Sequence, residues 1–299
     1  MTAAATTRQG DYGRLRRVML RHVRDAWADD ARIDCTWRAL NYTERPDRQK
    51  AVAEYDRFAE IMKSRGVVVD LLPAGKELTL DSIYMRDAAV SSDRGLILCS
   101  MGKEARRGEP ADVGRLAREL KVEILGAIEG TGLLEGGDVA WLSERTVAVG
   151  RGQRTNEEGI RQLRHLLGDS VDEVLEIPLP DIEHPGDVFH LMSIFSPVDR
   201  DLAVVYPPLM PPSLRAALKA HGIAAVEVPD EEFFTMGCNV LALAPRVCLM
   251  ISGNPKTRAR LMSAGAEVIE YEGREISLKG CGGPTCLTRP LDRDRSASG

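Results

Sequence analysis

The chain has 299 residues, of which 43% are apolar, and its formal net charge at pH 7 is −5. This length supplies a sizeable core for one large domain or two ordinary ones. The acidic balance, with no dominant basic block, excludes nucleic acid and anionic membranes as expected partners. No run of residues approaches the roughly 20 apolar positions that a membrane span needs.

Both ends of the sequence are expected to be disordered tails, at 1–13 and 292–299, around a single domain at 14–291. The first residues lack a charged segment followed by an apolar core, so we expect no secretory signal and a cytoplasmic protein. Disulfides are not expected in that reducing setting. Neither a CxxC pair nor an HExxH or HxH spacing occurs, so no metal site is expected. The six cysteines are Cys35, Cys99, Cys238, Cys248, Cys281 and Cys286.

Amphipathic helices alternate with apolar strands along the chain. The pattern predicts a strand at 15–23 and then a helix at 44–66, which ends in glycine and is followed by a buried strand. Each of the later helices is also followed by an apolar strand, and most of them end in glycine. These later helices are expected at 109–121, 155–168, 212–222 and 255–265. The alternation predicts an α/β fold.

The segments before these helices share one pattern, which forms a weak internal repeat. In each segment a polar residue precedes an apolar strand, a short polar turn and a second apolar strand. The fifth unit lacks its second strand, which the strand at 15–23 could supply, closing a ring without open sheet edges. We therefore predict five α/β modules around an axis; an open sheet with accidental spacing is the alternative. The polar residues recur about 50 residues apart, at Asp87, Asp138, His190, Asn239 and Cys286.

Rotation about an axis would bring matching positions of the modules together at one site. A thiolate is a nucleophile, an imidazole moves protons, and carboxylates bind a cation or orient the base. Carboxylates around one thiol would attract a guanidinium, whose planar fork suits paired carboxylates. The predicted chemistry is attack by sulfur on an electron-poor carbon flanked by nitrogens. The residues expected to converge are Asp87, Glu135, Asp138, His190, Asn239 and Cys286.

Each of these residues also has a purely structural interpretation. Asp87 could form a strand-end ion pair with Arg86, and the carboxylates of Glu135 and Asp138, which bracket two glycines, could cap a turn. His190 lies between apolar residues, where a hydrogen-bonded core histidine is common. Three further cysteines lie in apolar strands and are expected to be small buried hydrophobes, namely Cys99, Cys238 and Cys248.

Five motifs, YMRD, LLEGGDV, GRGQRTNEEG, FHL and GGPTCLT, occur in this order between residues 14 and 291. Together they resemble the guanidine-modifying superfamily, which includes arginine deiminases, dimethylarginine dimethylaminohydrolases, agmatine deiminases and amidinotransferases. EGGD combined with the histidine and the C-terminal cysteine is fairly specific, whereas each alone is weak. The resemblance implies a five-bladed, pseudo-symmetric α/β propeller, the pentein fold, in agreement with the repeat.

The resemblance also implies catalytic roles. Cys286 would attack the guanidinium carbon, and His190 would protonate the leaving amine and then activate water against a covalent thiouronium intermediate. Glu135 would hydrogen-bond the guanidinium and the histidine, and Asp87 would bind the guanidinium nitrogens. No metal or organic cofactor is implied. Because family members often pair, a homodimer is one expected state.

Further residues are expected to bind the substrate. Arg154, in GRGQRTNEEG, matches an arginine that binds the substrate's α-carboxylate in relatives, and Arg86 is expected to assist it. Asn239 belongs to the same set, whereas Asp138 is expected mainly to support the site. The segment 100–110 is a candidate for a mobile basic loop that faces the substrate.

One departure from the family pattern concerns the position two residues after the histidine. Deiminases and amidinotransferases commonly carry an aspartate there, and this chain has Met192. A thioether cannot pair with an N–H and suits an alkyl group, which favours an N-alkylated guanidine over plain arginine. Asp187 or Ser193 is the alternative source of the missing contact.

We therefore expect a cysteine-dependent hydrolase that converts an N-methylated arginine into citrulline and an amine. The alternatives are arginine deimination to citrulline and ammonia, amidino transfer to an amine, and a non-catalytic protein that binds a cationic amino acid. Cys281 is a rival nucleophile, but it precedes the Gly-Gly pair that the family cysteine follows. A second hypothesis makes Cys281 the redox partner of Cys286.

Overall fold

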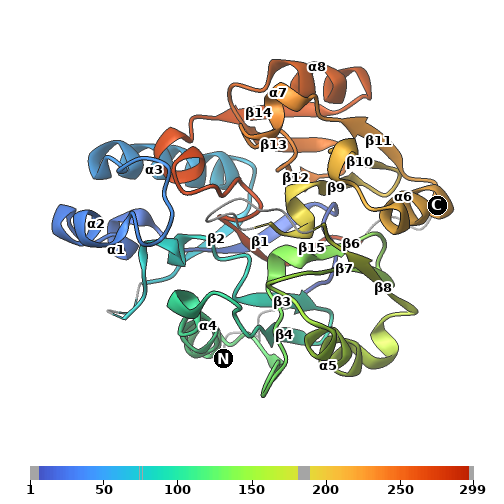
Figure 1. Ribbon diagram of the computed structural model, residues 1–299, viewed down its shortest axis with the longest axis horizontal. Coiled ribbons are helices and arrows are strands. Elements are labelled where there is room, and N and C mark those ends of the chain that lie inside the picture. Colours follow the sequence, from blue (N-terminus) through green and yellow to red (C-terminus); the bar gives the residue numbers. More distant parts are fainter. Residues whose placement is uncertain (1–6, 74, 76, 181–188, 296–299) are drawn as a thin grey trace.

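The computed structural model describes residues 7–73, 75, 77–180 and 189–295. Five three-stranded sheets lie within these residues. In every sheet the middle strand pairs antiparallel with its first neighbour and parallel with its second. The sheets surround a common axis in Figure 1. The prediction of five modules is confirmed.

The strands of each sheet follow in the order first, middle and third. Three sheets are β15 (Arg289–Arg293), β1 (Leu15–Leu20), β2 (Val68–Leu71); β3 (Ala89–Ser92), β4 (Gly95–Leu98), β5 (Ile124–Ala127); and β6 (Val139–Trp141), β7 (Thr146–Arg151), β8 (Glu173–Pro178). The other two are β9 (Phe195–Asp199), β10 (Leu202–Val205), β11 (Ala224–Glu227); and β12 (Leu241–Ala244), β13 (Val247–Ile251), β14 (Glu267–Tyr271).

A helix joins the middle strand to the third strand in every module, and these helices lie at the rim of the molecule (Figure 1). The joining helices are α3 (Arg48–Ser64), α4 (Glu109–Glu119), α5 (Glu157–Leu167), α6 (Pro212–Ala220) and α8 (Pro255–Ser263). All five were expected from the sequence, with ends that differ by a few residues. Three short helices were not expected: α1 (Val23–Ala26), α2 (Asp30–Thr36) and α7 (Asp230–Phe233).

Helix α5 illustrates how local chemistry sets the helix ends. The Asn156 side chain accepts a hydrogen bond from the Gly159 amide, which satisfies a free N–H of the first turn. Glu157 and Glu158 place negative charge at the positive end of the helix dipole. Gly168 ends the helix with φ of +50°, a backbone conformation that glycine adopts most easily.

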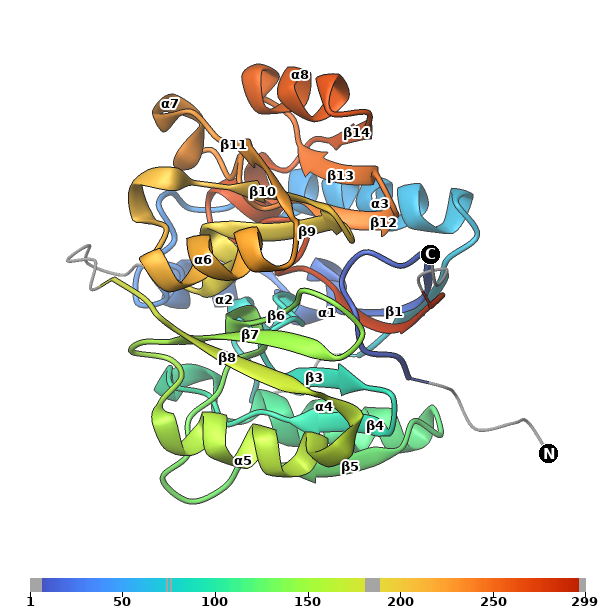
Figure 2. The same cartoon turned by 90° about the vertical axis from the view of Figure 1, so that its right-hand side faces the viewer.

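The ring closes where the two ends of the chain pair. Strand β1 lies antiparallel to β15 and parallel to β2, so the last strand completes the first module. Figures 1 and 2 show β1 and β15 side by side. The first strands of neighbouring modules also contact one another around the axis, and their residues are largely buried. The residues just before these strands therefore meet at one end of the axis.

The folded part extends beyond the expected limits of 14 and 291. Residues 7–13, expected to be a tail, include the buried Gln9 and Asp11, and the Arg8 amide donates to the Leu291 carbonyl at 2.7 Å. Strand β15 continues to Arg293. Polar side chains can remain ordered in such a segment when they find buried partners. The outer parts of both expected tails, 1–6 and 296–299, lie outside the described residues.

Candidate active site

Five modules contribute residues from equivalent positions to one end of the axis. Asp87, His190, Asn239 and Cys286 precede the first strands of four modules, and Glu135 precedes the short 3-10 turn that leads into β6. Each side chain is held by the turn that starts a buried strand, which limits its freedom. The convergence predicted from the repeat is therefore present in the structure.

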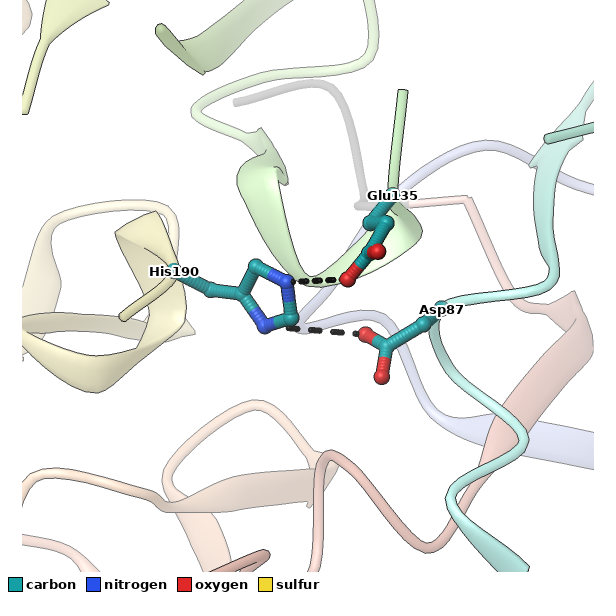
Figure 3. A group of neighbouring side chains, drawn as sticks. All are labelled: Asp87, Glu135 and His190. Atoms are coloured by element: carbon teal, nitrogen blue, oxygen red, sulfur yellow. Dashed lines mark hydrogen bonds and ion pairs between the residues drawn. The ribbon is translucent and has the colours of Figure 1, made fainter. Parts of the chain in front are cut away.

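An acid–base group lies on one side of this end (Figure 3). His190 Nε2 lies 2.8 Å from Glu135 Oε2, and His190 Nδ1 lies 3.7 Å from Asp87 Oδ1. All three side chains are buried. Glu135 Oε1 additionally accepts from the amide of Gly102 at 2.9 Å. The imidazole is thus placed between two carboxylates that are themselves fixed by the backbone.

The glycine pair of the EGGD motif makes this arrangement possible. A Cβ on Gly136 would lie 2.1 Å from the Arg86 carbonyl oxygen, and one on Gly137 would lie 2.5 Å from His190 Nδ1. The Gly137 amide donates to Asp87 Oδ1 at 3.1 Å. Any side chain at these positions would separate the carboxylates from the imidazole.

The electrostatics of the site favour an ion pair between His190 and Glu135. Burial alone would lower the pKa of His190, but Asp87, Asp138 and Glu135 together raise it to about 9. Burial alone would raise the pKa of Glu135, but the hydrogen bond and charge of His190 and two nearby arginines lower it to about 2. At neutral pH the imidazole is therefore protonated and the carboxylate ionised.

Asp87, Glu135 and His190 also have the composition of a small metal site, since their ligand atoms lie within 4.8 Å of one another. A metal ion bound there would have to displace the proton of His190, whose pKa is raised to about 9. The carboxylates already contact cationic groups, namely Arg106, Arg154 and the imidazolium. The group is therefore suited to a guanidinium and a mobile proton.

The nucleophile candidate, Cys286, lines the same cavity and lies in the turn that precedes β15. Asn239 Nδ2 lies 3.3 Å from Cys286 Sγ, and Asn239 Oδ1 accepts from the Thr285 amide and hydroxyl at 3.0 and 2.8 Å. A Cβ on Gly283 would lie 2.4 Å from Asn239. Burial and the nearby Asp87 raise the pKa of the Cys286 thiol, whereas Asn239 opposes the rise. Cys286 is a neutral thiol in this state.

Cys281 occupies a different environment. It lies on the cavity wall with φ of +56°, and its Sγ lies 3.9 Å from the Leu278 carbonyl oxygen. The flanking Gly280 and Gly282 pack against the Tyr84 ring, where a Cβ would lie 1.9 and 2.3 Å from its atoms. The side-chain amide of Asn239 contacts Cys286, the cysteine that follows the Gly-Gly pair.

A cavity of about 690 Å³ opens above these groups. Asp87, His190 and Cys286 form its floor. Met192, expected to face the substrate, does line it. Ser193 lines it too, but its hydroxyl already accepts from the His190 amide at 3.2 Å, and Asp187 lies outside the described residues. Much of the remaining wall is apolar, from Leu40, Phe189, Tyr206, Leu209, Phe233 and Met236.

The expected substrate-binding arginines are engaged elsewhere. Arg154 does not line the cavity; its Nη1 lies 3.3 Å from Glu135 Oε1. Arg86 borders the cavity, but its Nη2 donates to Asp11 at 2.6 Å. Asp87 borders the same cavity. The assisting role of Arg86 in substrate binding stays a prediction.

Asp138 is likewise not a cavity residue. Its Oδ1 accepts from the Leu191 amide at 3.0 Å, and its Oδ2 accepts from the Thr155 hydroxyl at 2.6 Å. Burial raises its pKa to about 6. The carboxyl joins the EGGD turn to the turn after His190, which corrects its assignment to substrate binding and agrees with a supporting role.

The sequence analysis missed Arg106 as an individual residue. Arg106 lines the cavity, is buried, and donates to Asp87 Oδ2 at 2.6 Å and to Glu109 Oε2 at 2.8 Å. It lies in the segment 100–110, which was flagged only as a basic loop. Lys103 of the same segment also lines the cavity and contacts Asp81 at 2.6 Å. Both residues lie outside the repeat positions, so no spacing signal identified them.

Comparison with known proteins identifies the family. The family described as N,N dimethylarginine dimethylhydrolase, eukaryotic, matches residues 26–293. The chain belongs to this family. It is accordingly a hydrolase of guanidino carbon–nitrogen bonds. Among the described residues, no helix combines the length and apolar character of a membrane span.

Individual relatives agree with the family. YkgA of Bacillus subtilis is 28% identical over 240 residues, which cover 80% of this chain and 79% of that protein. The arginine deiminase of Rhodococcus opacus is 33% identical over 195 residues, or 55% of this chain and 47% of that enzyme. The matched region thus spans only about half the length of the arginine deiminases.

Solved structures show the same fold. A variant of the dimethylarginine dimethylaminohydrolase (DDAH) from Pseudomonas aeruginosa, complexed with citrulline, has a TM-score of 0.73 at 21% identity, covering 92% of this chain and 98% of that one. The N-terminal domain of ArgZ, a cyanobacterial arginine dihydrolase, was solved with substrate; its TM-score is 0.78 at 19% identity, covering 93% and 98%. The pentein fold expected from the motifs is confirmed.

Proposed function

We propose that the chain hydrolyses an N-methylated arginine to citrulline and a methylamine, with Cys286 as the nucleophile. The observation that carries the proposal is that a thiol and an acid–base group line the same cavity. The thiol is neutral, and the imidazole is protonated and hydrogen-bonded to an ionised carboxylate. These are the nucleophile and the proton donor that displacement of an amine from a guanidinium carbon requires.

The positive charge of the substrate would favour ionisation of the Cys286 thiol. A guanidinium bound to Asp87 and Glu135 would place a positive charge beside Cys286 and offset the repulsion from Asp87 that raises its pKa. The thiol then releases its proton to solvent and the thiolate attacks the guanidinium carbon. His190 gives its proton to the departing amine, leaving an S-alkylthiouronium on Cys286.

His190 then acts as a general base in the second half of the reaction. Neutral His190 takes a proton from water, and the hydroxide attacks the thiouronium carbon. The C–S bond breaks, Cys286 leaves as a thiolate, and the ureido product is released. Glu135 stays ionised throughout and orients the imidazole. One guanidine and one water are consumed, and one urea and one amine are formed.

Two ion pairs favour an amino-acid substrate over a simple guanidine such as agmatine. Arg106 contacts Asp87 and Arg154 contacts Glu135, so an incoming guanidinium would compete with both arginines. A substrate carboxylate could pair with the arginines that are released, whereas agmatine would leave their charge uncompensated at high cost. This exchange supports the family-based role of Arg154.

Met192 supports the methylated substrate. Its thioether lines the cavity beside His190 and offers an apolar contact to a methyl group. We propose Met192→Asp as the specificity test. Expected is a fall in kcat/KM for asymmetric dimethylarginine of about tenfold or more and a gain for arginine, while Met192→Leu keeps the methylated preference.

The first experiment is a mass-spectrometric product screen with arginine, monomethylarginine, asymmetric dimethylarginine, hydroxyarginine and agmatine, run beside Cys286→Ser. Citrulline plus a methylamine, absent with the variant, supports the proposal. Citrulline from arginine alone would favour the second candidate, deimination, which the arginine deiminase relatives suggest. A new guanidino product on adding an acceptor amine would indicate amidino transfer, and tight binding without turnover a binding protein.

The proposal includes a reducing, cytoplasmic location, because a free thiol nucleophile and six unbridged cysteines are stable there.

The homodimer stays a prediction, which sedimentation of the purified protein checks. The redox hypothesis for Cys281 is tested by intact mass after mild peroxide. A loss of about two hydrogens that persists in Cys281→Ser would exclude a bridge to Cys286.

A further inference from the structure

One buried aspartate lies outside the substrate cavity and beside the turn that carries Asp87. Asp11 belongs to the segment before β1 and is 5% exposed. Within the described residues, the walls of the substrate cavity include Arg86 and Asp87 but not Asp11. Burial alone would raise the pKa of Asp11, but the charge of Arg86 and a hydrogen bond from the Trp141 amide lower it. The side chain is therefore an ionised carboxylate that the proposed mechanism does not use.

The Asp11 carboxylate joins the two modules that supply the acid–base carboxylates. Its Oδ1 accepts from Arg86 Nη2 at 2.6 Å, and its Oδ2 accepts from the Trp141 amide at 2.7 Å. Arg86 directly precedes Asp87, and Trp141 lies in β6, the strand that follows the EGGD turn. One buried side chain thus bridges the turn of Asp87 and the strand that follows Glu135.

The backbone around Arg86 contacts the other parts of the site. The Arg86 amide donates to the Cys286 carbonyl at 3.1 Å, and the Gly136 amide donates to the Asp87 carbonyl at 3.0 Å. Arg289 Nη1 donates to the Arg86 carbonyl at 3.3 Å. A displacement of Arg86 would therefore move both the turn that precedes β15 and the EGGD turn.

The guanidinium of Arg86 has few other contacts that fix it. Its Nη2 donates to Asp11, whereas its Nε and Nη1 have no hydrogen-bond partner among the described residues. The side chain is buried, so solvent screens its charge little. Removal of the Asp11 charge would leave a buried cation without its carboxylate, which strongly favours movement of the guanidinium.

We propose that Asp11 is a positioning residue, which acts through Arg86 to hold the turn that precedes β15 against the turn of Asp87. This inference rests on the proposed function, since it concerns the placement of the groups assigned there. Asp11 touches neither the substrate nor the reacting atoms. Its carboxylate fixes the Arg86 side chain, and the Arg86 backbone fixes the two turns. The segment 7–13 is in this way part of the catalytic scaffold.

Asp11→Asn is the informative substitution, because Arg86 is itself predicted to assist in substrate binding. The asparagine keeps an acceptor for the Trp141 amide and removes only the charge that pairs with Arg86. It should lower kcat by about tenfold or more and keep KM within about threefold, because a misplacement of roughly 1 Å can slow a reaction about 100-fold. A raised KM with kcat intact, or a wild-type kcat, would overturn the proposal.

A double-mutant cycle in kcat/KM tests whether Asp11 acts through Arg86. In the Arg86→Met background, Asp11→Asn should change kcat/KM by less than about twofold. An equal loss from Asp11→Asn in both backgrounds would contradict the proposal. If Asp11→Asn alone does not fold, the double variant decides, because it replaces the buried ion pair by neutral side chains. A lowered kcat in the double variant supports positioning, whereas a wild-type kcat excludes it.

Asp112→Asn is the matched control. Asp112 is the carboxylate partner of Arg21, another buried guanidinium, and neither residue is among the described residues that line the substrate cavity. This variant should lower Tm about as much as Asp11→Asn does, because each leaves a buried arginine unpaired. It should nevertheless keep kcat near the wild-type value. Equal losses of kcat in the two variants would show that Asp11 only stabilises the fold.

Diffraction from Asp11→Asn crystals separates this inference from the proposed function. The Arg86 side chain should be displaced, and the contact of 3.1 Å between the Arg86 amide and the Cys286 carbonyl should be lengthened or lost. A wild-type protein that turns over no guanidine would reject the proposed function, while this structural result would still test the positioning. Unchanged positions of both turns in the variant would overturn the inference even if the wild-type protein is active.

Discussion

The catalytic floor has two halves, the acid–base half of Asp87, Glu135 and His190 and the nucleophile half of Cys286 and Asn239. They differ in how far their protonation states suit catalysis before substrate binds. Glu135, Asp87 and His190 are joined through backbone amides and a short hydrogen bond, and the pKa values of Glu135 and His190 already favour the charged pair. The Cys286 thiol has only weak contacts, with Asn239 Nδ2 at 3.3 Å and with the Thr285 hydroxyl at 3.9 Å among the described residues, and its pKa is raised. In the proposed mechanism the acid–base half is therefore complete in the free protein, whereas the nucleophile half needs the substrate's charge. Such a division restricts thiolate formation to molecules that bring a cation.

The largest effect is expected when the proposed nucleophile is removed. Cys286→Ser should lower turnover by at least about 10³-fold, because a serine hydroxyl with no adjacent neutral base is a poor nucleophile. Binding of substrate, measured by titration calorimetry, should persist because Asp87 and Glu135 remain. Cys281→Ser is the matched control and should keep near wild-type turnover. Comparable loss in both variants would reject the assignment of Cys286.

The next largest effect is expected from a substitution in the acid–base half. Glu135→Gln should lower kcat by about 10²- to 10³-fold, because the imidazole loses the carboxylate that orients and charges it. The pKa of His190, followed by NMR, should fall below about 9 at the same time. Glu158→Gln, on the exposed face of α5, is the control. A loss of stability alone, with kcat intact, would make the EGGD turn purely structural.

The pH dependence of kcat/KM tests the acid–base half without any substitution. Above pH 9 we expect kcat/KM to fall by up to about tenfold per pH unit, because His190, with its pKa raised to about 9, loses the proton it must donate. Its contribution to the free energy of unfolding is present below the unfolded pKa of about 6.5 and is lost as pH rises through 9. A kcat/KM that keeps rising to pH 10 contradicts this protonation state.

The smallest expected effect concerns the contact that holds the thiol. Asn239→Ala should slow kcat/KM roughly fivefold and move alkylation of Cys286 by iodoacetamide to higher pH, since the donor to sulfur is lost. Asn239→Asp keeps an acceptor for the Thr285 amide but removes the donor, so it should move the alkylation curve further. An unchanged curve in both variants would show that Asn239 only shapes the turn.

The sequence predicted the parts of the site that follow from symmetry. Asp87, His190, Asn239 and Cys286 precede equivalent strands, so their spacing alone indicated that they meet. Glu135 was found from the glycines beside it, which the close approach of His190 and Asp87 requires. The helices were predicted because apolar periodicity and capping residues are local features.

The parts that failed depend on contacts made by single side chains. Arg106 lies outside the repeat, in a charged segment that resembles an ordinary solvated turn. Arg86 was expected from the family resemblance to assist Arg154, whereas its guanidinium pairs with Asp11 in the structure. No local pattern marks Asp11 as buried, since its partners come from two other modules. Long-range pairing of this kind is not encoded in periodicity.

The pairing of β1 with β15 has a consequence for biosynthesis. The proposed nucleophile Cys286 and the strand β15 that closes the ring both follow residue 285, so a nascent polypeptide has no competent site until residues 286–293 have left the ribosome. A message that terminates before codon 286 would yield a product without the thiol and with β1 lacking its antiparallel neighbour. Such a product exposes an open edge to aggregation and to quality control. Catalytic competence thereby requires translation through β15.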